Sequence, residues 1–159
     1  MSFAYSTTRL LHDEHEAALV LLERTASALR RQDADDAAIV SAARHLAHAL
    51  RGEITEHFTF EEQFVFPRLI ERGCGDIVEL LDEEHQTLNE AFAEILDLIA
   101  PLEAALTADL DVTRFRRLFG VVDTGLRGHI EKEELGLLRM IEEFFDRDLD
   151  AEAASRHGD

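Results

Sequence analysis

The chain has 159 residues, with 34 acidic and 16 basic side chains and a formal net charge of −18. Its length predicts one domain with a sizeable core, and its apolar fraction of 46% is typical of a globular chain rather than a disordered one. A surface this acidic repels phosphate backbones and anionic lipids, so neither a nucleic acid nor a membrane is expected as a partner.

Cysteine content and the first residues favour a cytoplasmic location. The single cysteine, Cys74, excludes an internal disulfide framework and fits a reducing compartment. Residues 1–6 lack the basic segment and apolar run of a signal peptide, and the longest obvious apolar run, 17–22, is too short to span a bilayer. We expect a monomer or a weak homo-oligomer, with Cys74 as a bystander thiol in an exposed turn.

Helical periodicity runs along nearly the whole chain, and strand signals are almost absent. A first helix is predicted from residues 6–8, which offer capping hydroxyls, to about Gln32. After a polar connection at 33–36, a second helix is predicted over about 36–72. Pro67 should kink this helix or loosen its last turns, because proline removes a backbone donor.

The second half of the chain repeats this organisation. The turn at 73–75 ends the second helix, and Asp76 is a plausible cap for a third helix that runs to about Ala100, where Pro101 begins to unravel it. After a loop at 107–111, a fourth helix is predicted over about 112–146.

Short connections between long helices imply antiparallel neighbours, so the sequence predicts an all-α fold, an antiparallel up-down-up-down four-helix bundle. This bundle should occupy residues 1–150 as one domain, and residues 151–159 should form a frayed C-terminal tail.

A repeated motif is the most informative feature of the chain. The segment 10–15, Leu-Leu-His-Asp-Glu-His, reappears at 80–85 as Leu-Leu-Asp-Glu-Glu-His. The segment 57–62, which contains His-x-x-x-Glu-Glu, reappears at 129–134. A lone histidine followed by a histidine with a glutamate four residues later therefore occurs twice. Imidazole and carboxylate groups repeated at helical spacing are what a two-metal centre inside a helix bundle requires.

The spacing inside each motif selects the candidate ligands. The histidine and the first glutamate are four residues apart, so they project about 40° apart from one helix face. The second glutamate falls about 140° away and is expected to face solvent, which applies to Glu62 and Glu134. The faces with the histidines are otherwise apolar, and a cation would satisfy carboxylates that are costly to bury unpaired. We therefore predict six metal ligands: His15, His57, Glu61, His85, His129 and Glu133.

Each motif alone is typical of a solvated ion pair, and a single inward histidine is typical of a hydrogen-bonded core residue; only the matched set favours a metal. The other histidines are weaker candidates. His12 lies one turn from His15 and is either a rim residue or an additional ligand. His45 and His48 are predicted on the surface of the second helix, and His157 is assigned no role.

The order of these motifs, together with the stretch His57-Phe-Thr-Phe-Glu-Glu-Gln-Phe-Val-Phe-Pro67, resembles the hemerythrin-like (HHE cation-binding) family over about residues 6–146. The resemblance implies a four-helix bundle with a non-haem di-iron centre, in which two Fe ions are bridged by an oxo or hydroxo group and by carboxylates. Mn or Zn would also suit such ligands. Carried over position by position, it implies His15 and His57 on one iron, His85 and His129 on the other, and Glu61 and Glu133 as bridges.

The chain departs from that family's oxygen carriers at one position. These proteins have His-x-x-x-His on the third helix, whereas here Asn89 follows four residues after His85. Each metal would then have two histidines and an exchangeable position filled by solvent or, on one metal, by His12. Reversible oxygen binding for transport is therefore disfavoured, and Asn89 is expected to hydrogen-bond a small ligand at the centre.

We therefore predict a cytoplasmic di-iron protein that binds, senses or scavenges a small molecule: O2, NO, peroxide or iron itself. Any enzymatic activity would be peroxide, O2 or NO chemistry at the metals. The alternative is a metal-stabilised interaction or regulatory module whose iron loading is read by a partner. A ferritin-like carboxylate oxidase is disfavoured, because it needs Glu-x-x-His motifs and here Ile54 and Leu126 occupy the glutamate positions. Phe64 and Phe92 are expected to form an apolar wall beside the metals.

Overall fold

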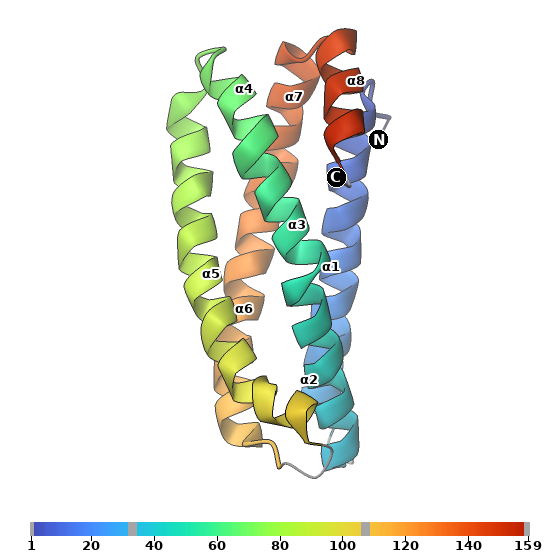
Figure 1. The fold of residues 1–159 in the computed structure, drawn as a ribbon, viewed down its shortest axis with the longest axis vertical. Coiled ribbons are helices and arrows are strands. Elements are labelled where there is room, and N and C mark those ends of the chain that lie inside the picture. The colour runs from blue at the N-terminus through green and yellow to red at the C-terminus, as the bar shows by residue number, and fades with distance from the viewer. Residues whose placement is uncertain (1, 32–34, 106–108, 158–159) are drawn as a thin grey trace.

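The computed structural model describes residues 2–31, 35–105 and 109–157. Within these ranges the chain is helical and contains no strand, and four long helical columns pack side by side in alternating directions (Figure 1). The predicted antiparallel up-down-up-down bundle is confirmed. The columns are α1 (Ser6–Arg30); α2 (Asp36–Arg51), α3 (Glu53–Phe60), the π-helix η1 (Glu61–Val65) and α4 (Phe66–Ile70); α5 (Gly75–Ala104); and α6 (Val112–Lys132), the π-helix η2 (Glu133–Leu137) and α7 (Leu138–Phe144).

Two helices of the columns begin at side-chain caps, whereas two residues predicted to begin or end a helix do not. Asp35 and Asp111 cap α2 and α6, because their carboxylates accept hydrogen bonds from backbone N–H groups of the first turn. Asp76 does not cap α5, since that helix already begins at Gly75. Pro101 does not end it either, because α5 continues to Ala104. The predicted end of the first helix at Gln32 and parts of both polar connections (33–34 and 107–108) lie outside the described residues.

The second column is interrupted at two places. Gly52, with φ −104° and ψ −100°, separates α2 from α3, and the hydroxyl of Thr55 donates a hydrogen bond to the carbonyl of Leu50 across this break. The second interruption is η1, which directly precedes α4 with Pro67 in its first turn. Proline alone does not explain a π-helix here, because η2 occupies the matching position of the fourth column without one. What the two π-helices share is a buried glutamate as first residue.

The C-terminal segment differs from its prediction. Residues 147–156 form a further helix, α8 (Arg147–Arg156), which packs beside the N-terminal end of α1 (Figure 1). The prediction of a frayed tail is therefore wrong for residues 151–156, whereas 158–159 lie outside the described residues. Two interactions explain the order: Leu149 and Ala153 are buried in the core, and Asp150 accepts hydrogen bonds from the first backbone N–H groups of α1.

The core consists of two apolar clusters with a polar layer between them. One cluster, built around Leu22, Leu46 and Phe115, fills the half of the bundle that contains α2, and the other, around Leu11 and Leu69, fills the half that contains α4. Between them lie four histidines and two glutamates, each at most 7% exposed. No helix in the described part of the chain is long and apolar enough to cross a membrane.

Candidate metal centre

All four columns contribute to the polar layer, and the six side chains that the sequence singled out meet there. Their possible ligand atoms fall into two groups, and within each group these atoms lie within 4.8 Å of one another. Both groups contain the same two glutamates, and each adds two histidines of its own. The first group is His15, His57, Glu61 and Glu133, and the second is His85, His129, Glu61 and Glu133.

Glu133 lies between the two groups. Its Oε2 is 2.7 Å from Nε2 of His15, and its Oε1 is 2.6 Å from Nε2 of His129. Burial would raise the pKa of Glu133, but its histidine neighbours outweigh this effect and hold the pKa well below the usual value. Glu133 is thus a charged carboxylate with one oxygen directed at each group, as a bridging ligand requires.

Glu61 has the same arrangement, and the surroundings of its oxygens bear on whether the site suits cations. Its Oε1 is 3.1 Å from Nε2 of His57, and its Oε2 is 3.2 Å from Nε2 of His85. These contacts do not have hydrogen-bond geometry, and among the described residues neither oxygen of Glu61 has a hydrogen-bond partner; nor does Oε1 of Glu133. Unsatisfied carboxylate oxygens at 0% exposure are costly, and cations between the histidines and the glutamates would satisfy them. The residues present therefore fit a pair of bound cations.

Three of the clustered histidines have raised pKa values in the metal-free protein. Burial would lower the pKa of His15, but hydrogen bonds to Glu133 and Glu134 raise it to about 9. Burial opposes the same effect at His85, where Glu133 and Glu61 raise the pKa to about 10. The pKa of His57 is also raised well above its usual value. A metal binds neutral imidazole, so a cation that enters this site displaces protons that otherwise balance the glutamates.

A second carboxylate faces the other ring nitrogen of each histidine. The Nδ1 atoms lie 2.8, 2.5, 2.8 and 3.1 Å from carboxylate oxygens in the pairs His15–Glu134, His57–Glu14, His85–Glu62 and His129–Glu84. Such a carboxylate fixes the tautomer that directs Nε2 at the centre and makes the imidazole a stronger ligand. Each candidate histidine ligand therefore has its own orienting acceptor.

Two of these acceptors make contacts that helical geometry did not predict. Glu62 and Glu134 were expected to face solvent, and they are partly exposed, but their carboxylates bind His85 and His15. Each is the second residue of a π-helix, one position after the buried glutamate of its motif. From that position each carboxylate reaches across to the histidine of a neighbouring column.

The other two acceptors, Glu14 and Glu84, were not predicted at all. A signal for them was present in the repeat, because each glutamate directly precedes the lone histidine of its half. Both reach across to the histidine of the neighbouring column rather than their own neighbour in sequence. This pairing depends on how the columns are placed.

Two polar residues beside the motif do not join the centre. His12 is not one of the clustered ligands; its Nδ1 lies 3.0 Å from the Glu134 carboxylate, which makes it an outer partner of that group. Asn89 is exposed, so the expectation that its amide faces a bound ligand is wrong. The inward face of α5 continues from His85 through the buried Leu88 and Phe92 and leaves position 89 on the outside. His45 and His48 are exposed, as predicted.

The aromatic wall of the centre differs in part from its prediction. Phe58 stacks on the imidazole of His85, with ring centroids 3.8 Å apart and an interplanar angle of 3°, and its ring lies 5.6 Å from that of His129. Phe92 packs against Phe58 rather than on a histidine. The ring neighbour of Phe64 is Phe60, so its predicted place beside the histidines is wrong.

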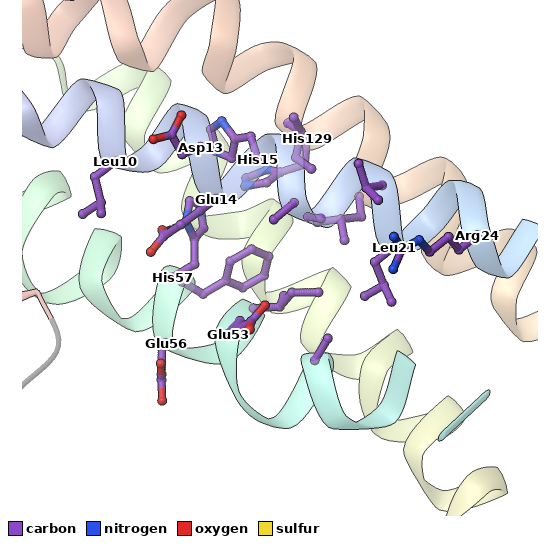
Figure 2. Close-up of a pocket in the computed structure, with 18 residues that line it drawn as sticks. Leu10, Asp13, Glu14, His15, Leu21, Arg24, Glu53, Glu56, His57 and His129 are labelled. Carbon is purple, nitrogen blue, oxygen red and sulfur yellow. The ribbon is translucent and has the colours of Figure 1, made fainter. Parts of the chain in front are cut away.

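A cavity of about 520 Å³ leads from the surface between α1 and the α2–α3 column to the candidate centre (Figure 2). Three of the candidate ligands border it: His15, His57 and His129. Its walls are mainly apolar, and acidic side chains such as Glu53 and Glu56 line it toward the outside. The centre is thus buried but within reach of a small molecule on this side.

Comparison with known proteins agrees with this geometry. Searches of the curated proteins and of the solved structures found no match. The family model described as the hemerythrin HHE cation-binding domain matches residues 6–141, which include all six clustered side chains and end before α8. The expected resemblance is therefore confirmed, and the chain belongs to the hemerythrin HHE cation-binding domain family.

Proposed function

We propose that the protein is a non-haem di-iron protein whose centre binds, senses or scavenges a small molecule such as O2, NO or peroxide. The observation that carries this proposal is the pair of four-residue clusters that share two buried glutamates with unpartnered oxygens. Bound iron would supply redox chemistry and open coordination positions. The assignment of ligands is His15 and His57 to one ion, His85 and His129 to the other, and Glu61 and Glu133 to both.

The surrounding residues support a reactive centre rather than a purely structural one. Two histidines per metal leave room for an exogenous ligand, and the cavity beside His15 and His57 offers such a ligand a path. The carboxylates on Nδ1 hold the imidazoles in one orientation. Phe58 covers the imidazole of His85 and limits the access of water on that side.

Metal analysis of anaerobically purified protein tests the proposal, because imidazole and carboxylate sites also accept Mn or Zn. We expect two irons per chain and a near-ultraviolet charge-transfer absorption that changes when air is admitted. His57→Ala and His129→Ala should each lose metal, whereas His48→Ala, which changes an exposed histidine of the same column as His57, should retain it. Equal losses in all three variants would contradict the assignment of the site.

A metal-stabilised regulatory module is the second candidate. It is favoured by the origin of the ligands in all four columns, since cations bound there would cross-link the whole bundle. Ligand binding to the folded state alone raises stability by mass action. A largely unfolded metal-free protein and a loaded form inert to O2, NO and peroxide would favour this module. A compact metal-free protein whose loaded form reacts with one of them would favour the reactive centre. The cytoplasmic location remains a prediction from sequence.

A further inference from the structure

His157, at the C-terminal end of α8, reaches the candidate metal centre through one intermediate carboxylate. Its Nε2 donates a hydrogen bond of 2.6 Å to Oε1 of Glu14. The other oxygen of Glu14 lies 2.5 Å from Nδ1 of His57. The imidazole of His157 is also packed edge-on against Phe60, with ring centroids 5.1 Å apart. A chain of direct contacts thus joins the last turn of α8 to a candidate ligand.

α8 is held in place at its other end by α1. Asp150 accepts hydrogen bonds from the backbone N–H groups of Ser6 and Thr7 at 3.0 and 2.8 Å and from both of their hydroxyls. Leu149 and Ala153 add buried apolar contacts. α8 therefore lies along α1 as one docked segment, and only when it is docked can His157 reach Glu14.

The other half of the centre shows a matched contact with a different origin. Glu84 is the counterpart of Glu14 in the repeat; it accepts from Nδ1 of His129 at 3.1 Å, and its other oxygen pairs with Lys132. Lys132 belongs to α6, the same helix as His129. The partner of Glu84 is thus built into the bundle, whereas the partner of Glu14 comes from a separate helix outside the residues that match the family.

We propose that His157 is a positioning residue for the subsite of His15 and His57. It holds Glu14 against His57, so that docking of α8 and filling of this subsite stabilise each other. The carboxylate of Glu14 is 27% exposed and, without His157, would be free to leave His57 for solvent. Coupling between binding events is reciprocal, so a cation in this subsite also tightens the docking of α8. The inference rests on the metal centre proposed above.

Cobalt titration of the full-length, metal-free protein under anaerobic conditions tests the proposal, with the visible absorption of Co2+ as the readout for each subsite. His157→Ala should lower the affinity for one of the two Co2+ ions by about tenfold or more and leave the affinity for the other unchanged. Loss of a group that orients a metal ligand acts on this scale. His157→Gln should recover most of the affinity, because its amide Nε2 can donate to Glu14. The matched variant Lys132→Ala should instead lower the affinity for the other ion.

Hydrogen–deuterium exchange of residues 147–156 gives a second readout that does not depend on reactivity. Co2+ should slow exchange in α8 of the wild type and of Lys132→Ala, but not of His157→Ala. Asp150→Asn loosens α8 without a change at Glu14. It should lower the affinity for the same Co2+ ion as His157→Ala does.

The two proposals fail in different ways. If His157→Ala and Asp150→Asn bind both Co2+ ions with wild-type affinity, or if exchange in α8 does not respond to Co2+ in the wild type, the role of His157 is refuted and the metal centre stands. If the wild type binds no Co2+ at the histidines, the proposed function itself fails and this inference fails with it.

Discussion

Glu134→Ala tests whether the second glutamate of the repeated motif supports a metal ligand or only faces solvent. A solvent-facing Glu134 would be dispensable, whereas the structure has its carboxylate 2.8 Å from Nδ1 of His15. Removal of such an orienting acceptor typically lowers metal affinity by about 10–100-fold, or roughly 1.4–2.8 kcal/mol. We therefore expect Glu134→Ala to lower the affinity for the metal at His15 by this amount.

Proton competition makes the expected loss depend on pH. The pKa of about 9 at His15 lies about two units above neutrality, so the removal of its proton by a metal at pH 7 costs the wild type roughly 3 kcal/mol at 1.36 kcal/mol per unit. Glu134 is one of the groups that raise this pKa, so Glu134→Ala reduces the competition at pH 7. The loss of affinity should therefore be larger at pH 8.5 than at pH 7.

Calorimetric titration with Co2+ at both pH values provides the assay. Glu131→Ala is a suitable control, because it removes an exposed carboxylate three residues away in the same column. The reasoning is refuted if Glu134→Ala and Glu131→Ala bind Co2+ with equal affinity at pH 8.5.

Three further predictions follow from the same contacts. The metal-free protein should be most stable between about pH 4.5 and 6.5. His15 and His85 have raised pKa values, so their contribution to stability is complete below pH 6.5 and is lost as the pH rises through about 9 and 10. Glu133 has a lowered pKa, so its contribution is present above pH 4.5 and is lost in acid. Urea midpoints that stay constant from pH 6 to 9.5 would contradict this. Phe58→Ala should destabilise the metal-free protein by about 3–5 kcal/mol in urea unfolding, because Phe58 is 3% exposed and packs on His85; a loss below about 1 kcal/mol would show that this stacking is absent in solution. Saturation with metal at a thousand times its dissociation constant should stabilise the fold by about 4 kcal/mol, and a chelator should reverse the shift in melting temperature; an unchanged melting temperature would mean that metal does not prefer the folded state.

The fold and the clustered side chains were accessible from sequence because both depend on periodicity. Short connections between long amphipathic segments allow few arrangements other than an antiparallel bundle. The repeat of His15 and His57–Glu61 as His85 and His129–Glu133 then directs all six donors toward one layer. No knowledge of side-chain conformations is needed for that step.

The orienting carboxylates were not accessible in the same way. Helical geometry directs Glu62 and Glu134 away from the histidine of their own motif, but their partners, His85 and His15, lie on other columns. Asn89 shows the opposite error: a position equivalent by sequence to a ligand in related proteins is exposed here, because the inward face of α5 passes through Leu88 and Phe92.

α8 was missed because its order comes from contacts that are distant in sequence. Its own pattern contains two buried apolar residues, Leu149 and Ala153, which is too few for a periodic signal. Its docking depends on Asp150 at the start of α1 and on His157 at Glu14, more than 140 residues away along the chain in both cases. Such partners become visible only when the columns are assembled.

Anomalous diffraction from crystals of the iron-loaded protein, recorded at the iron absorption edge, tests the central claim most directly. The account predicts two iron peaks in the buried layer, one between His15 and His57 and the other between His85 and His129, with Glu61 and Glu133 in contact with both. A single peak, or peaks bound only at surface carboxylates, would contradict it.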